Sequence, residues 1–322
     1  MIINPIKNIL REKTMKYYDY SDVNKLLHDK ELIELLCTNY SFDDLFNLFI
    51  KDDFLEFDSG IKIPFFAETR DYRGAKEKGK PDSIWIAKPI KEEEEVLNVE
   101  MAMICYFLDF YTHTLSAPQI ITKINGTLYK STKLIKAAQL SGANYTEIKQ
   151  LREQLLLDII NRWIYFDEDR NPNNYLLKYN SKNDQIIIAI DFGNADLLTK
   201  ELKIKGLQDK FGWERIEKTR YLTPLKSENC INYDMEFFNI RFNFFNKLSK
   251  EEIKEISESI LRFNPDKKSL AERISTNIKN RIDYVYGYFS EAVPKYCCQK
   301  KKTRDIYKDM GKAFNKIYNE DR

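Results

Sequence analysis

The chain has 322 residues, with 52 Lys and Arg against 50 Asp and Glu, and 43% of its residues are apolar. This length suits one large two-lobed domain or two domains of average size, and the apolar fraction excludes a globally disordered chain. The near balance of charge excludes a bulk electrostatic field that would favour nucleic acid or a membrane surface.

The two histidines and five cysteines exclude further site classes. Without a C-x-x-C spacing, the chain offers little for a zinc site or a histidine-based triad. Cys37 and Cys105 lie in apolar helical patterns typical of reduced, buried thiols. No N-terminal signal and no run of roughly 20 apolar residues is visible. We therefore expect a cytoplasmic protein with no membrane association.

The first 55 residues predict a helical extension. Residues 21–37 and 41–50 carry apolar side chains at helical spacing, each behind a serine that can cap the helix. Two successive helices could form a helix-turn-helix, but neither is basic. We therefore interpret residues 1–55 as a packing extension, and we expect no nucleic-acid partner for them.

Residues 56–140 predict a small lobe rich in β-structure. Short β-like runs at 54–69 and 83–90 are separated by a polar, basic stretch, 70–82, which we expect to be a mobile connection. A largely buried helix with an acidic first turn follows at 91–111. Two strands around Asn125-Gly126 then predict a hairpin.

Residues 141–322 predict a larger helical lobe. A long amphipathic helix covers 144–166, and residues 175–193 read as a hairpin whose second strand is wholly apolar and therefore buried. Nearly everything after Asp234 is helical, including a basic C-terminal helix. The predicted fold is α+β, with two lobes and an N-terminal extension.

Three oxygen-bearing side chains are expected to meet where the long helix gives way to this hairpin. Asp169 and Asn174 lie in the loop "DRNPNN", and Asp191 follows the buried strand in "IDFG". Two carboxylates and an amide oxygen suit Mg²⁺, which takes further ligands from water and substrate phosphates. The same Asp-to-Asn interval before D-F-G occurs in protein kinases. Individually, the three residues could merely cap turns.

A cation for nucleotide phosphates is expected from the small lobe. Lys88 lies within the apolar strand "SIWIAKP", where an unpaired ammonium would be costly. We expect Glu100, on the following helix, to be its partner in preference to Glu94 or Glu95, which fall in the exposed first turn. Lys88 could instead be an edge-strand lysine that discourages aggregation.

The segments "DIINRWIYFDEDRNPNNYLL" and "IIIAIDFGNAD" resemble the HipA-like kinases, a bacterial branch of the protein-kinase fold. They resemble the phosphoinositide lipid kinases more distantly. The resemblance spans roughly residues 60–290 and is specific around Lys88, Glu100 and residues 158–196. It implies that Asp169 is the catalytic base, and that Asn174 and Asp191 bind the metal. It also implies that Lys88, paired with Glu100, binds the phosphates of ATP.

The activity implied is ATP- and Mg²⁺-dependent phosphorylation of serine or threonine in a protein substrate, with a small DNA-binding antitoxin as a further partner. The sequence departs from the kinase pattern in having no G-x-G-x-x-G before Lys88, where only Gly74 and Gly79 occur, and no A-P-E after D-F-G. Three alternatives stay open: a pseudokinase that binds nucleotide without transfer, a lipid or small-molecule kinase, and a DNA-binding or antitoxin-like role that would rest on the N-terminal helices.

Overall fold

A computed structural model describes the central part of the chain: residues 54–63, 71–112, 114–145, 148–167, 169, 172–179, 185–199 and 233–296. Both the predicted helices of the N-terminal extension and the basic C-terminal helix lie outside the described residues. The predicted boundaries of the two lobes stay a prediction.

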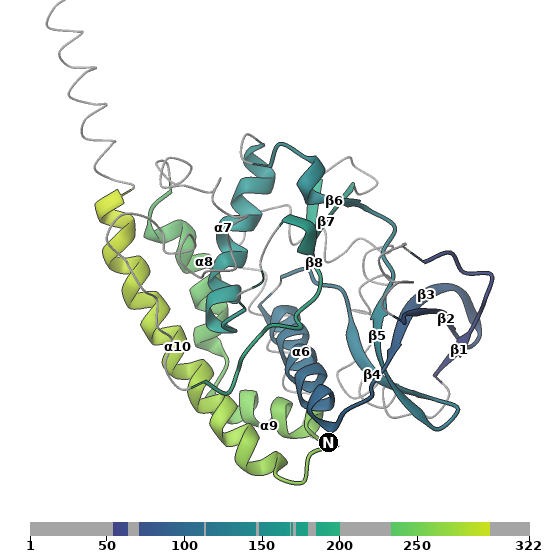
Figure 1. The fold of residues 1–322 in the computed structure, drawn as a ribbon. Helices are drawn as coiled ribbons and strands as arrows, with labels where there is room; N and C mark the ends of the chain where they lie inside the picture. The colour runs from purple at the N-terminus through teal and green to yellow at the C-terminus, as the bar shows by residue number, and fades with distance from the viewer. Residues whose placement is uncertain are drawn as a thin grey trace, which may run out of the picture.

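The described residues form a mixed α/β fold with two antiparallel sheets and five helices (Figure 1). The larger sheet is curled and has the strand order β1-β2-β3-β5-β4. Its strands are β1 (Leu55–Phe57), β2 (Arg73–Glu77), β3 (Lys80–Pro89), β4 (Gln119–Ile124) and β5 (Thr127–Lys133). The predicted hairpin is confirmed as β4–β5, since Asn125 and Gly126 both have positive φ, 51° and 81°, as a tight two-residue turn requires.

The expectation of a connection over residues 70–82 is wrong. Strand β2 and the start of β3 occupy this stretch, joined by a turn at Gly79, whose φ is 81°. The basic composition concealed a period-two pattern, in which Ala75 and Glu77 are buried while Lys76 lies on the other face. Lys76 is stabilised there by Asp58, 3.1 Å away.

Helix α6 (Glu93–Tyr111) packs against β4, and the chain just after it touches the second sheet through an isolated bridge between Ser116 and Ala189. That sheet has the order β6-β7-β8, and its β7–β8 pair confirms the second predicted hairpin. Its strands are β6 (Ala138–Gln139), β7 (Tyr175–Tyr179) and β8 (Gln185–Ala189). Helix α7 (Lys149–Ile164) packs on β8, and a 3-10 turn at Pro172–Asn174 leads directly into β7.

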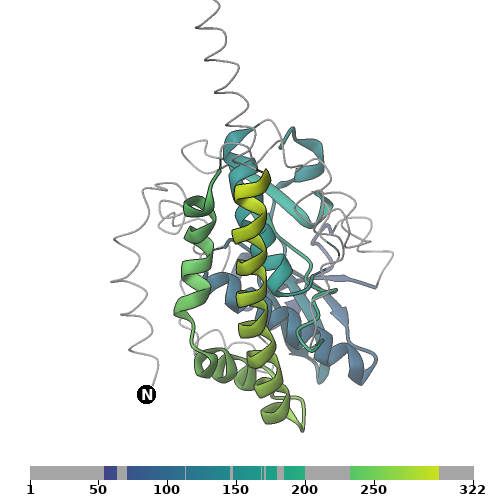
Figure 2. The ribbon, with the colours of Figure 1, turned by 90° about the vertical axis from the view of Figure 1, so that its left-hand side faces the viewer.

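Of the three remaining helices, the first and the last pack on α7, and the middle one packs on α6 (Figures 1 and 2). They are α8 (Met235–Lys247), α9 (Lys250–Ile260) and α10 (Lys267–Tyr296). Helix α9 begins with a capping box between Ser249 and Glu252, which satisfies backbone N–H groups at its N-terminus. Helix α10 runs along both α8 and α9 and also packs on α7. It therefore links the three helices that surround it.

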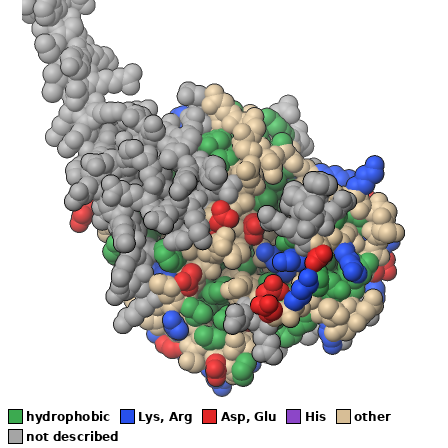
Figure 3. Space-filling model, in the orientation of Figure 1, with side chains coloured by type: hydrophobic (Ala, Val, Ile, Leu, Met, Phe, Trp, Pro, Cys, Tyr) green, Lys and Arg blue, Asp and Glu red, His purple; other side chains and the backbone are tan. Residues whose placement is uncertain are grey.

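None of the described helices is both long and apolar enough to cross a membrane. On the face shown in Figure 3, acidic and basic side chains are interspersed where the described surface is visible. Cys105 is fully buried within α6, as its apolar surroundings in the sequence predict.

Candidate active site

The loop that follows α7 holds Asp169 and Asn174 against each other. The Asn174 side-chain amide donates a hydrogen bond to the backbone carbonyl of Asp169, at 2.5 Å. Asn174 ends the 3-10 turn that precedes β7, so its position is set by the sheet as well as by the loop. Because this bond uses the amide nitrogen, the amide oxygen is the atom that Asn174 can offer to a cation.

Asp191 lies beside this loop, directly beyond β8. The Ile190 N–H donates to the Asn174 carbonyl, at 3.0 Å, which extends the β7–β8 pairing to the residue before Asp191. Asn194 then donates its side-chain amide to the Asp169 carboxylate, at 3.1 Å. The structure therefore brings the segments carrying Asp169, Asn174 and Asp191 together.

The backbone around Asp191 has a left-handed conformation. Its φ is 57°, a value that Asp and Asn adopt more readily than most residues. The carboxylate accepts a hydrogen bond from the Gly193 N–H, at 3.3 Å, and its side chain is 53% exposed. A side chain at position 193 would begin 3.1 Å from the Asp191 carboxylate, so glycine leaves this oxygen room.

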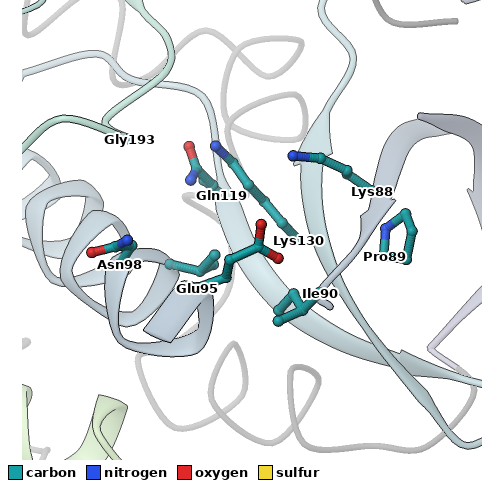
Figure 4. A pocket seen from close by; sticks show the side chains of 9 residues that line it. Lys88, Pro89, Ile90, Glu95, Asn98, Gln119, Lys130 and Gly193 are labelled. Carbon is teal, nitrogen blue, oxygen red and sulfur yellow. The ribbon is translucent and has the colours of Figure 1, made fainter. Parts of the chain in front are cut away.

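A pocket opens between the larger sheet and α6, next to these segments (Figure 4). Lys88 from β3 and Lys130 from β5 reach into it, Glu95 and Asn98 line it from α6, and Gly193 lines it from the segment after β8. The pocket volume is about 170 Å³. This is below the roughly 300 Å³ at which small-molecule sites begin.

Glu100 does not lie in this pocket with Lys88. Its side chain is fully buried, and one carboxylate oxygen accepts a hydrogen bond from the Phe263 N–H, 3.1 Å away between α9 and α10. At 100° per residue, Glu100 is turned about 140° around α6 from Glu95, which does line the pocket. Among the described α6 side chains, Glu95 is the carboxylate that lines the pocket with Lys88, whereas Glu100 accepts the Phe263 N–H.

Glu100 instead makes the junction of α6 with α9 and α10 sensitive to pH. Burial raises the pKa of Glu100 to about 7 from 4.5, against the lowering effects of the Phe263 N–H and the Arg262 guanidinium. Between these two pH values the folded chain keeps a proton that the unfolded chain has lost. The free-energy contribution of this group to stability therefore falls as pH rises from 4.5 to 7.

Replacing Glu100 by glutamine should remove this titration while keeping an acceptor for Phe263. We expect the free energy of unfolding of Glu100→Gln, relative to wild type, to rise by about 3 kcal/mol between about pH 4.5 and pH 8. Urea unfolding at several pH values measures the difference. Glu255→Gln, an identical change at an exposed position of α9, is the matched control. A relative stability that is flat with pH would contradict the assignment.

Lys130 is the pocket residue that the sequence interpretation missed. It lies directly opposite Lys88 in the β3–β5 register, and its ammonium is 3.6 Å from the Asp191 carboxylate. The Asn125-Gly126 turn predicts the β4–β5 hairpin and so places Lys130 on a strand. The missing information was the pairing of β5 with β3, which no local pattern supplies.

A buried ionic cluster lies next to the segment that carries Asp191. Arg162 of α7 contacts Asp109 of α6 at 2.5 Å and Asp158 at 2.9 Å, and all three side chains are almost completely buried. The guanidinium also lies 4.8 Å from the ring centre of Phe192, the residue after Asp191. The cluster thus joins α6 and α7 directly beneath the segment that carries Asp191.

Helix α10 contacts the C-terminal end of the segment that follows β8. Arg281 donates hydrogen bonds to the backbone carbonyls of Ile164 and Asp196, at 3.1 and 2.7 Å, and also to that of Thr199. Asp167, in the loop after α7, has a buried side chain, and its backbone forms an isolated bridge with Ala195. The loop after α7 and the segment after β8 are therefore fixed together at several points.

No family model matches this chain, and no curated protein matches it. Among solved structures, it is similar to a Helicobacter pylori proinflammatory kinase, CtkA, with a TM-score of 0.39 and 8% identity over 77% of this chain and 98% of that one. It is also similar to HipA of Shewanella oneidensis MR-1, in a complex with HipB and operator DNA. There the TM-score is 0.36 and the identity 10%, over 65% of this chain and 60% of that one. Likeness at this level leaves the function to be inferred from the residues of the site.

Proposed function

We propose that this protein is a kinase-like phosphotransferase that uses ATP and Mg²⁺ to phosphorylate a hydroxyl group. The acceptor that the sequence resemblance implies is serine or threonine in a protein. The observation that carries the proposal is the joining of Asp169, Asn174 and Asp191 through the Asn174 and Ile190 hydrogen bonds. Lys88 lines the neighbouring pocket and supplies a cation for phosphate oxygens.

The donor set fits Mg²⁺. Asn174 and Asp191 offer an amide oxygen and a carboxylate, and Asp191 already attracts the Lys130 ammonium. The described residues contain no group of three or more His, Cys, Asp or Glu that could enclose a metal ion. A site with so few protein ligands leaves positions for water and phosphate, as Mg²⁺ sites in phosphotransferases do. When bound, the ion would neutralise charge on the phosphate oxygens.

In this proposal Asp169 accepts the proton of the acceptor hydroxyl. Its carboxylate is oriented by Asn194, and its backbone carbonyl is fixed by Asn174. As the acceptor oxygen forms a bond to the γ-phosphorus, the bond from that phosphorus to ADP breaks, and Asp169 accepts the hydroxyl proton. Catalysis then comes from positioning and charge neutralisation and needs no covalent enzyme intermediate.

Incubation of the full chain with γ-labelled ATP and a cell lysate tests this proposal. We expect Mg²⁺-dependent transfer of label to protein, abolished by EDTA, with the modified residue identified by mass spectrometry. A parallel panel of lipid and small-molecule alcohols tests the alternative acceptor classes. Absence of label from every acceptor, at protein and nucleotide concentrations where binding is measured, would overturn the proposal.

A nucleotide-binding pseudokinase is the second candidate, and the glycines before Lys88 favour it. Gly74 has no room for a side chain, because a Cβ there would lie 2.7 Å from the Ile61 side chain. Gly79 serves the β2–β3 turn. Both glycines thus have roles within the sheet that need no phosphate. The DNA-binding partner and the cytoplasmic location stay predictions.

A further inference from the structure

Two lysines face each other across the middle of the larger sheet. Lys88 and Lys130 are register partners on the antiparallel strands β3 and β5, so their side chains leave the same face of the sheet. The Cβ atoms of directly opposite residues are about 4.5–5.5 Å apart. Figure 4 shows both side chains extending in the same direction within the pocket.

Such a pair is unfavourable by itself, because like charges directly opposite each other on neighbouring strands repel. The Lys130 side chain is only 19% exposed, so water screens it poorly. The pKa of the exposed Asp71 carboxylate is lowered mainly by the Lys91 ammonium, which contacts it at 2.8 Å, and Lys88 adds only a smaller lowering effect. Glu95 shares the pocket, but one of its carboxylate oxygens accepts the Lys91 N–H, at 2.9 Å.

Asp191 is the acidic group beside Lys130, and its contact is loose. The two charged atoms are 3.6 Å apart, longer than a hydrogen bond, and the carboxylate is about half exposed. A metal ion on Asp191 would withdraw that carboxylate from Lys130. Two neighbouring ammonium groups would then face the pocket together, which is an arrangement suited to a multiply charged anion.

We propose that Lys130 is a second phosphate-binding lysine, which acts with Lys88 on the triphosphate of the nucleotide. The inference rests on the proposed function and extends it by one binding residue. Asp191 neutralises Lys130 while the pocket holds no phosphate. The ammonium then turns to the phosphate oxygens when the nucleotide and its metal ion enter.

Calorimetric titration of the full chain with tripolyphosphate, ATP and adenosine tests this role. Hydrogen bonds from a charged donor are strong enough that Lys130→Met should weaken tripolyphosphate and ATP binding by about 10- to 100-fold. Adenosine has no phosphate, and its affinity should change less than about twofold. Lys130→Arg keeps the charge and should retain most of the affinity. Lys136→Met, an exposed lysine just after β5, is the matched control.

Each possible result of these titrations either supports or contradicts a phosphate-binding role for Lys130. Wild-type protein that binds no tripolyphosphate, or Lys130→Met protein that binds it normally, would overturn it. Equal losses for ATP and adenosine would also overturn it, because a purely structural role affects both. If wild type binds tripolyphosphate but not ATP, and Lys130→Met loses that binding, Lys130 is a phosphate-binding residue, but its action on a nucleotide and the proposed function both fail. Thermal unfolding of each variant verifies that it is folded.

Discussion

Replacing Arg162 by methionine is expected to lower the free energy of unfolding by about 3–5 kcal/mol, the usual effect of removing one partner from a buried ion pair. The substitution leaves Asp109 and Asp158 without their shared cation in a region closed to water. Burial already raises the pKa of Asp109, and Arg162 is the main group that opposes this. Urea unfolding at neutral pH measures the loss.

A triple variant separates the charge effect from lost packing. Arg162→Met combined with Asp109→Asn and Asp158→Asn removes the whole buried charge cluster, and we expect it to recover much of the lost stability. Arg273→Met changes an exposed arginine of α10 in the same way and should stay within about 0.5 kcal/mol of wild type. A loss below about 1 kcal/mol for Arg162→Met alone would show that this cluster is not a major support of the fold.

The elements that sequence predicted well carry strong local signals. The Asn125-Gly126 turn demands positive φ at two successive residues, and the structure has it there. The apolar run before Asp191 forms the buried strand β8, followed by the segment that meets Asp169. In both cases the residues that determine the structure are neighbours in the chain, so the structure can be predicted without knowledge of the fold.

The partner of Lys88 could not be predicted in the same way. Helix α6 is buried over most of its circumference from Val99 to Asp109, so apolar periodicity does not tell which face meets the sheet. From sequence alone, exposure in the first turn argues against Glu95. That exposure is instead what lets Glu95 line an open pocket, while Glu100 packs against the α9–α10 connection.

The Arg162 cluster was missed for a related reason. Asp158 and Arg162 are four residues apart on α7, but Asp109 is a single acidic residue in the apolar part of α6, and α6 meets α7 only through the tertiary fold. The cluster explains how the scaffold reaches the site, since Arg162 lies between the two aspartates and the ring of Phe192. The buried Arg162 guanidinium therefore fixes the position of Phe192. Because Phe192 follows Asp191 directly, this contact also limits the orientation of the Asp191 carboxylate.

Replacing Asp169 or Asp191 by asparagine should impair two different properties, phosphoryl transfer in the first case and Mg²⁺-dependent ATP binding in the second. Asp169→Asn removes the proton acceptor, so we expect transfer to fall by about 10²- to 10⁴-fold with ATP affinity nearly unchanged. Asp191→Asn removes a metal ligand. Changes one shell beyond a metal typically cost about 10- to 100-fold in metal affinity, so losing a direct ligand should weaken Mg²⁺-dependent ATP binding at least that much.

The two substitutions are well matched because neither changes the size of the side chain, and asparagine also accepts the φ of 57° at position 191. Binding is measured by titration with ATP in the presence and absence of Mg²⁺, and transfer by label from γ-labelled ATP. Asp283→Asn, an exposed aspartate of α10, should change neither. Normal transfer by Asp169→Asn would remove that residue from the chemistry. Mg²⁺-dependent binding that survives in Asp191→Asn would place the ion elsewhere, because the remaining predicted ligand, Asn174, offers only one neutral oxygen.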